Sequence, residues 1–215
     1  MNDRKQREAR LRNRESGSWG TVSTWYFHCV ELVFRESEKT VPAAQPSRWV
    51  YAGLPVLMTG VEAFLVEHQQ MLNDSSGIET LAGVDPVREV LKLYPLPDEL
   101  RRDLDALIEI RNLIVHPSQV PFGKAEWPDS LQRLCERKVL DGNIPQSGTH
   151  ALALLENHRL FAWAVEKCAE TLDVVADSDP ERSWMFRGSA GNLWRVLKPA
   201  VGSHGDEPIA SFPSP

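Results

Sequence analysis

An apolar helix that a proline brings to an end is the feature that most constrains this chain. The stretch covers residues 106–117 and reads ALIEIRNLIVHP. Its leucines, isoleucines and valine surround a few polar residues, as in a helix that buries much of its surface. Pro117 cannot continue the helical hydrogen-bond ladder and disfavours helical backbone in the residue before it. The sequence therefore predicts that a core helix ends at or near His116.

Three polar side chains fall in the last turns of this helix, namely Arg111, Asn112 and His116. At about 100° per residue, Asn112 and His116 share a face, whereas Arg111 lies about 140° from His116 and must curl its side chain to join them. Burying an arginine costs several kcal/mol unless the charge is paired. We therefore expect the three groups to converge and Arg111 to have a partner or a function.

Apolar residues at helical spacing predict an all-α bundle of about five main helices with extra short helices and irregular tails. A first helix runs from a Thr21 cap to about Ser37, with an apolar stripe formed by Val22, Trp25, Tyr26, Cys29, Leu32 and Val33 and ending in Glu36. The second helix, about 47–72, is the most hydrophobic and is expected to be central. A short helix follows Asp85 and Pro86, and the helix that ends at His116 opens after Pro97.

Two more helices are expected after Pro117. A short one contains Leu131, Leu134 and Cys135, and Thr149 is expected to cap a long one that ends near Asp177. The chain is divided into a basic flexible arm (1–19), a bundle domain (20–177) and a C-terminal tail (178–215). The tail is expected to be partly docked, with a short helix at 192–197, and then disordered.

Charge and composition exclude several classes of protein. The net charge is −6 over 215 residues, yet the first fourteen carry six basic residues against two acidic ones. An acidic body argues against tight nonspecific binding of nucleic acid, which the basic arm can partly offset. No apolar run approaches the length of a membrane span and no signal peptide is indicated, so we expect a cytoplasmic protein. The three cysteines lack metal or disulfide spacing and are expected to be buried thiols.

The sequence Arg111-Asn112-x-x-x-His116 resembles the Arg-x(4 to 6)-His motif of the HEPN superfamily, in the form with asparagine after the arginine. An upstream helix carrying Val61-Glu62-Ala63-Phe64 resembles the second helix of the family, and the resemblance covers roughly residues 20–177. It implies a helical bundle, a homodimer and, in many members, a metal-independent endoribonuclease. It also implies an RNA substrate and a protein antitoxin or regulator, as in toxin–antitoxin or phage-defence systems.

On this resemblance, His116 is the acid or base, Arg111 holds the phosphate, and Asn112 contacts the ligand or orients the histidine. One histidine and one arginine do not cover every step of RNA cleavage, so two copies of the motif are expected to meet across a two-fold axis. Glu62 is a supporting residue that either pairs with Arg111 or is a solvated carboxylate. No cofactor or metal is expected.

Two alternatives remain open at this point. The first is a catalytically inactive HEPN domain that dimerises and binds RNA, a nucleotide or a protein. The second is a purely structural cluster, in which Arg111 pairs with Glu62 and His116 caps carbonyl groups at the helix end. The position of His116 and Arg111 distinguishes these functions. Burial within one protomer would favour the structural cluster, whereas a position facing a groove would favour the nuclease or the inactive binding domain.

Overall fold

The computed structural model describes residues 22–39, 47–72, 86–116, 129–140, 153–179 and 183–198. Within these ranges the regular elements are all helices, and five of them are long. The helices are α2 (Val22–Glu38), α3 (Trp49–Leu72), α4 (Pro86–Leu91), α5 (Asp98–Val115), α6 (Asp129–Glu136), α8 (His158–Asp177) and α9 (Ser183–Leu197). The predicted all-α bundle is thereby confirmed.

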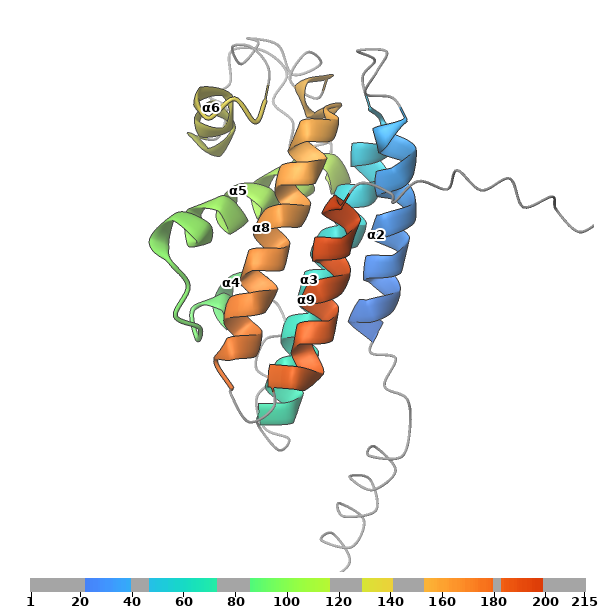
Figure 1. The fold of residues 1–215 in the computed structure, drawn as a ribbon. Helices are drawn as coiled ribbons and strands as arrows, with labels where there is room; N and C mark the ends of the chain where they lie inside the picture. Colours follow the sequence, from blue (N-terminus) through green and yellow to red (C-terminus); the bar gives the residue numbers. More distant parts are fainter. Residues whose placement is uncertain are drawn as a thin grey trace, which may run out of the picture.

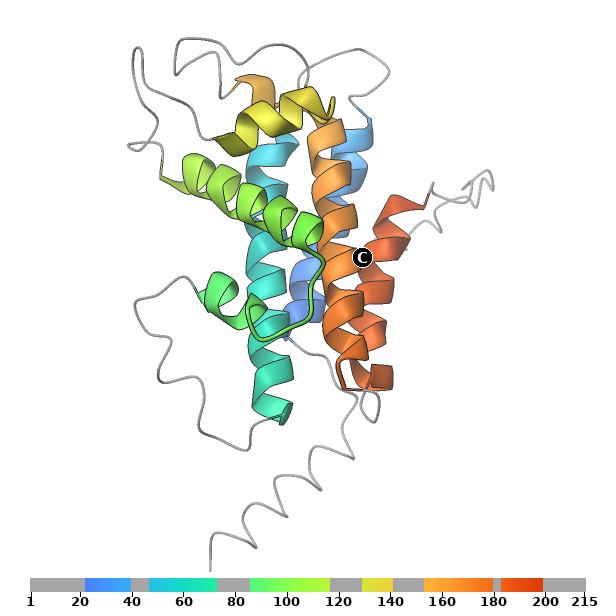
Figure 2. The same cartoon turned by 90° about the vertical axis from the view of Figure 1, so that its left-hand side faces the viewer.

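Four helices, α2, α3, α8 and α9, run along a common long axis (Figure 1). Helix α5 crosses α3 and α8 obliquely on one side of this group, and α6 lies against α5 (Figure 2). Helix α2 lies on the opposite side of the bundle from α5 in both views. The motif helix is therefore an outer layer on a four-helix core.

Helix α3 is central, as its hydrophobicity predicts, and it packs against α2, α4, α5 and α8. Two glycines allow close approach of its neighbours. A Cβ atom added to Gly53 would lie 2.2 Å from Cζ of Phe161 in α8, and one added to Gly60 would lie 2.7 Å from Cε1 of Phe27 in α2. Pro55 lies inside the helix rather than in its first turn.

The expectation that no apolar run reaches the length of a membrane span is wrong for α3. Its 21-residue stretch Trp49–Gln69 is long and apolar enough to cross a membrane, although half of the window is buried inside the protein. Because α3 packs against four other helices, this composition is that of the core helix of a bundle.

The predicted buried stripe of α2 is wrong. Trp25 is 69% exposed and Leu32 is 70% exposed. The buried residues lie on another face of the helix, and they are Ser23, Phe27, Val30, Phe34 and Ser37. Cys29 is exposed and Cys135 is partly buried, so the expectation of buried thiols holds only for Cys168.

Hydrogen bonds satisfy the two buried serines of α2. The carboxylate of Glu67 in α3 accepts from the Ser23 hydroxyl at 2.6 Å and from the Ser23 backbone N–H at 3.2 Å. Ser37 lies 2.5 Å from the hydroxyl of Ser47 and 2.9 Å from Nδ1 of His158. Ser37 therefore links the C-terminal end of α2 to the residues that begin α3 and α8.

Helix α8 begins at His158, where the Asn157 side chain accepts from the Arg159 N–H at 2.8 Å. The expected Thr149 cap lies outside the described residues, and Glu156 and Asn157 interrupt the helical backbone before His158. One face of α8 is buried along its length, at alternating spacings of four and three residues, by Phe161, Val165, Cys168, Leu172 and Val175.

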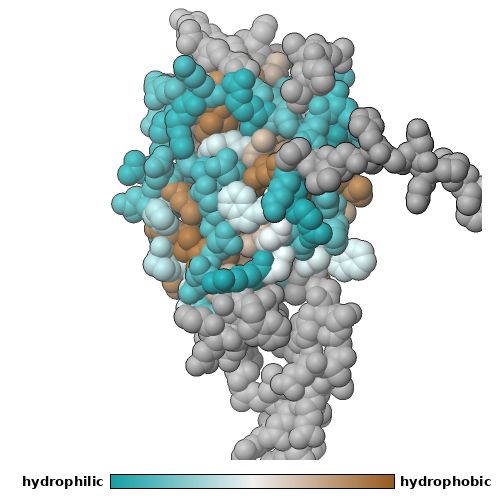
Figure 3. Space-filling view, viewed as in Figure 1, coloured by the Kyte–Doolittle hydropathy of each residue, from teal (hydrophilic) through white to brown (hydrophobic). Residues whose placement is uncertain are grey.

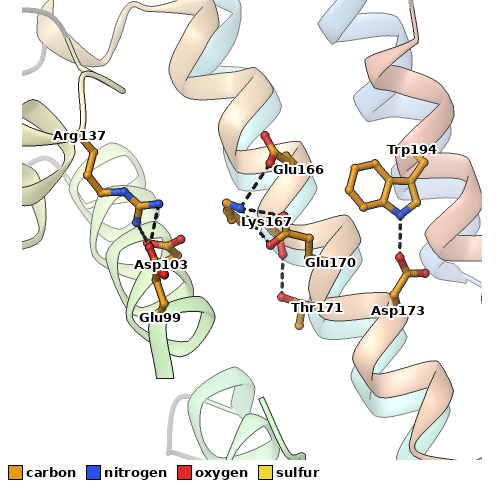
Figure 4. Close-up of polar contacts among 9 residues, drawn as sticks. All are labelled: Glu99, Asp103, Arg137, Glu166, Lys167, Glu170, Thr171, Asp173 and Trp194. Carbon is orange, nitrogen blue, oxygen red and sulfur yellow. Dashed lines mark hydrogen bonds and ion pairs between the residues drawn. The ribbon is translucent and has the colours of Figure 1, made fainter. Parts of the chain in front are cut away.

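The chain beyond Asp177 contributes a full helix to the bundle. Helix α9 starts at Ser183, nine residues before the predicted short helix. Trp194 donates to the Asp173 carboxylate in α8 at 2.7 Å (Figure 4). Near the same end of α9, Arg35 of α2 donates to the carbonyls of Arg195 and Lys198. The basic arm of residues 1–19 and the predicted disorder of 202–215 lie outside the described residues.

Candidate functional site

The Arg111, Asn112 and His116 cluster lies at the C-terminal end of α5. This helix buries Leu104, Leu107, Ile110 and Leu113 along one face, together with other apolar residues. Arg111 and Asn112 are partly buried, whereas His116 is exposed. The polar groups therefore occupy the outer side of a helix that the core holds firmly on its other side.

Asn112 connects the other two residues. Its side-chain oxygen accepts a hydrogen bond from the Arg111 guanidinium at 2.9 Å. Its backbone carbonyl accepts from the N–H of His116 at 2.8 Å. His116 is the C-cap residue, with φ −120° and ψ 69°, so the helix ends where Pro117 predicts. Of the three groups expected to converge, the side chains of Arg111 and Asn112 meet, whereas no hydrogen bond within the described residues joins the His116 side chain to either.

Acidic residues lie on the same helical face as the site. Asp105, Glu109, Asn112 and His116 follow one another at spacings of four, three and four residues, which places them in one row. Arg88 of α4 reaches this row: its Nε lies 3.0 Å from Asp105 Oδ1, and its guanidinium lies 3.9 Å from Glu109 Oε1. Arg88 thus offsets part of the negative charge next to His116.

Of the two alternatives for Glu62, the pair with Arg111 does not form. Neither a hydrogen bond nor an ion pair joins these two residues within the part of the chain that the structure describes. Glu62 is partly buried on α3, and the Arg111 guanidinium bonds to Asn112 instead. This removes the contact on which the purely structural explanation of Arg111 depends.

A buried carboxylate anchors α5 from the other side. Asp103 is 5% exposed and pairs with the guanidinium of Arg137, which follows α6 and also lies 3.3 Å from Glu99 (Figure 4). Burial raises the pKa of Asp103, although the charges of Arg137 and Lys167 favour its ionised form. The ion pair fixes the segment after α6 against the motif helix.

A second set of polar contacts fixes the start of α5. The Tyr94 hydroxyl lies 2.6 Å from Nδ1 of His68 and accepts from Gln69 at 2.7 Å, and burial raises the pKa of Tyr94 to about 12. Arg101 donates to the carbonyls of Leu91 and Tyr94 in the turn before α5. The N-terminal half of the helix is therefore held in place.

The arrangement offers a cation, an amide and an imidazole to a ligand in solvent. A guanidinium can bind a phosphate through two parallel hydrogen bonds, and an exposed imidazole can transfer protons near neutral pH. In the described ranges, no group of three or more His, Cys, Asp or Glu residues has the geometry to hold a metal ion. Sequence reasoning missed Arg88, because no local pattern links it to acidic residues seventeen and twenty-one positions later.

Comparisons of the chain with protein-family models, with curated proteins and with solved structures give no match.

Proposed function

We propose that the chain is a HEPN-type, metal-independent endoribonuclease whose active site forms between two copies of α5. The observation that supports it most is the exposure of His116 on the same face of α5 as Asn112, whose side chain accepts a hydrogen bond from the Arg111 guanidinium. A cytoplasmic location, an RNA substrate and a protein antitoxin or regulator are part of the same proposal.

The proposed chemistry uses the 2′-hydroxyl of the substrate as the nucleophile. One histidine takes the 2′-OH proton as the oxygen attacks phosphorus, and the P–O5′ bond breaks as a second acid protonates the leaving oxygen. Arg111 stabilises the charge that builds on the phosphoryl oxygens. A two-fold axis would bring His116 and Arg111 of a second copy to the same phosphate, which provides both an acid and a base.

The test measures cleavage of a short RNA in excess EDTA. We expect a 2′,3′-cyclic phosphate product, no cleavage when the scissile nucleotide is 2′-deoxy, and a loss of about 10²-fold or more in His116→Ala. His28→Ala is the matched control, because His28 is an exposed histidine of α2, and α2 lies on the opposite side of the bundle from α5. Equal cutting of the 2′-deoxy substrate, or full activity of His116→Ala, would contradict the proposal.

The acidic row favours a second candidate, a catalytically inactive HEPN domain that binds a protein or a nucleotide. Asp105 and Glu109 would repel the backbone of an RNA strand, and Arg88 offsets only part of this charge. This candidate predicts that the parent protein does not cleave RNA, whereas Arg111→Ala still weakens binding of a partner.

A further inference from the structure

The outer face of α2 carries an apolar stripe that the bundle does not cover. The stripe consists of Val22, Trp25, Cys29 and Leu32, and Val22, Trp25 and Leu32 are 59%, 69% and 70% exposed. Cys29 is exposed as well. At about 100° per residue, the stripe points about 140° away from the buried face of the helix. It therefore cannot contribute to the core of its own protomer.

The spacing of the stripe is that of a helix-packing seam. Its members are separated by three, four and three residues, and Glu36 continues the pattern four residues later. This is the a/d spacing with which two helices interlock side chains. Scattered exposed apolar residues are normal on a protein surface, but a continuous row at this spacing over most of a helix marks an interaction site.

We propose that the α2 stripe packs against the same stripe of a second copy of this chain, with the two helices antiparallel. In an antiparallel pair centred near Cys29, Trp25 of each copy lies opposite Leu32 of the other. Such an arrangement is self-complementary, as a two-fold interface requires. The two Cys29 residues then meet near the axis.

The charges on α2 favour this orientation. A parallel pair in register would place Glu36 of one copy opposite Glu36 of the other, and like charges directly opposed are destabilising. The antiparallel pair places Glu36 opposite Val22 at the edge of the contact. There, Glu36 keeps its ion pair with Lys39 of the same chain. The antiparallel pair is therefore the more favourable arrangement.

The exposed area fits a weak homodimer. Val22, Trp25 and Leu32 expose on the order of 400 Å², whereas a standard interface needs about 800 Å² from each partner. Tyr26, Val33 and Arg35 flank the stripe and add to the contact. At the right-hand edge of the space-filling view, over α2, white and brown surface lies among hydrophilic side chains (Figure 3). We expect a dimer that dissociates on dilution.

The inference does not depend on the proposed nuclease activity. Helices α2 and α5 lie on opposite sides of the bundle (Figures 1 and 2). Pairing through α2 therefore leaves the α5 helix of each copy free. A chain that makes both contacts would assemble beyond a dimer. Loss of the α2 contact is read from molecular mass, whereas failure of the nuclease proposal is read from RNA cleavage.

The test measures the mass of the full chain by sedimentation over a hundredfold range of concentration. We expect mass to rise with concentration and to fall by half in Leu32→Glu. The matched control is Leu93→Glu, because Leu93 is 68% exposed but lies in the turn after α4, away from the stripe. A parent that stays monomeric at every concentration overturns the proposal, as does an equal effect of the two substitutions.

Disulfide crosslinking through Cys29 provides a second test of the contact. It uses the parent protein, in which the α2 stripe carries no substitution. A copper–phenanthroline oxidant removes two electrons and two protons from a pair of thiols that meet, and leaves a disulfide. We expect this oxidant to convert the parent into a covalent dimer and Cys29→Ser to stay uncrosslinked. Crosslinking that persists in Cys29→Ser, or its absence in a parent shown to be dimeric, would place the contact elsewhere.

Discussion

The guanidinium of Arg111 donates a hydrogen bond at 2.9 Å to the side-chain oxygen of Asn112, its neighbour in the sequence. Adjacent residues point about 100° apart on a helix, so the arginine side chain must curl around α5 to make this bond. It brings the charge towards the face that also carries His116. Asn112 therefore acts as a positioning residue for the guanidinium, and this role can be tested separately from catalysis.

Asn112→Ala should misplace the guanidinium while leaving the fold intact. A hydrogen bond to a charged group contributes about 1.5–3 kcal/mol, so we expect RNA cleavage to fall at least tenfold. The loss should stay below that of Arg111→Ala, which removes the charge itself. Thermal unfolding should change little, because Asn112 is only partly buried. A variant as active as the parent would show that Arg111 needs no support from Asn112.

Gly53→Ala should destabilise the bundle at the contact between α3 and α8. The added Cβ would lie 2.2 Å from Cζ of Phe161, which is fully buried. Overpacking of this kind costs about 1–3 kcal/mol, against a gain of about 1 kcal/mol in helix propensity. We expect a net fall in the free energy of unfolding, measured with urea.

Gly188→Ala is the matched control for this substitution. Nothing lies within 4 Å of a Cβ at this exposed position of α9. The alanine should therefore stabilise the protein, by up to about 1 kcal/mol, through helix propensity alone. A gain of stability would also indicate that α9 unfolds together with the rest of the bundle. No effect would indicate that α9 unfolds separately.

The protein should lose stability on acidification through His158. Burial lowers the pKa of His158 below 6.5, and the charge of Glu38 opposes this shift only in part. Below pH 6.5 the unfolded chain takes up a proton that the folded protein does not, so the free energy of unfolding falls as the pH decreases towards the folded-state pKa. Urea unfolding across this range should show a shallower dependence on pH in His158→Asn, which cannot titrate. The same slope in both proteins would assign the effect to another group.

The sequence predicts the position of the candidate site well because its determinants are local. Pro117 alone places the end of α5 near His116, and the helical period places Asn112 on the same face. Whether Glu62 pairs with Arg111 could not be decided from the sequence, for the opposite reason. It depends on how two helices are rotated against each other, which the sequence pattern of either helix does not determine.

The buried face of α2 could not be predicted because both faces of this helix carry large apolar residues. Phe27, Val30 and Phe34 face the core together with two serines, which lowers the apparent hydrophobicity of that face. The partners that satisfy those serines are distant in sequence, with Glu67 bound to Ser23 and His158 bound to Ser37. The length of α9 was underestimated because Gly188 and Gly191 weaken its helical pattern.

A composite site between two copies of α5 makes the sharpest prediction about activity. Arg111→Ala and His116→Ala homodimers each lose one type of residue completely, whereas their heterodimer retains one arginine and one histidine that can meet in a single groove. Cleavage by heterodimers purified with two different tags should exceed that of both homodimers. Recovery should stay well below the parent, because groups that act as a unit are not additive. Confirmed heterodimers without any recovery would count heavily against a shared site, and an active parent that is monomeric at the assay concentration would exclude it.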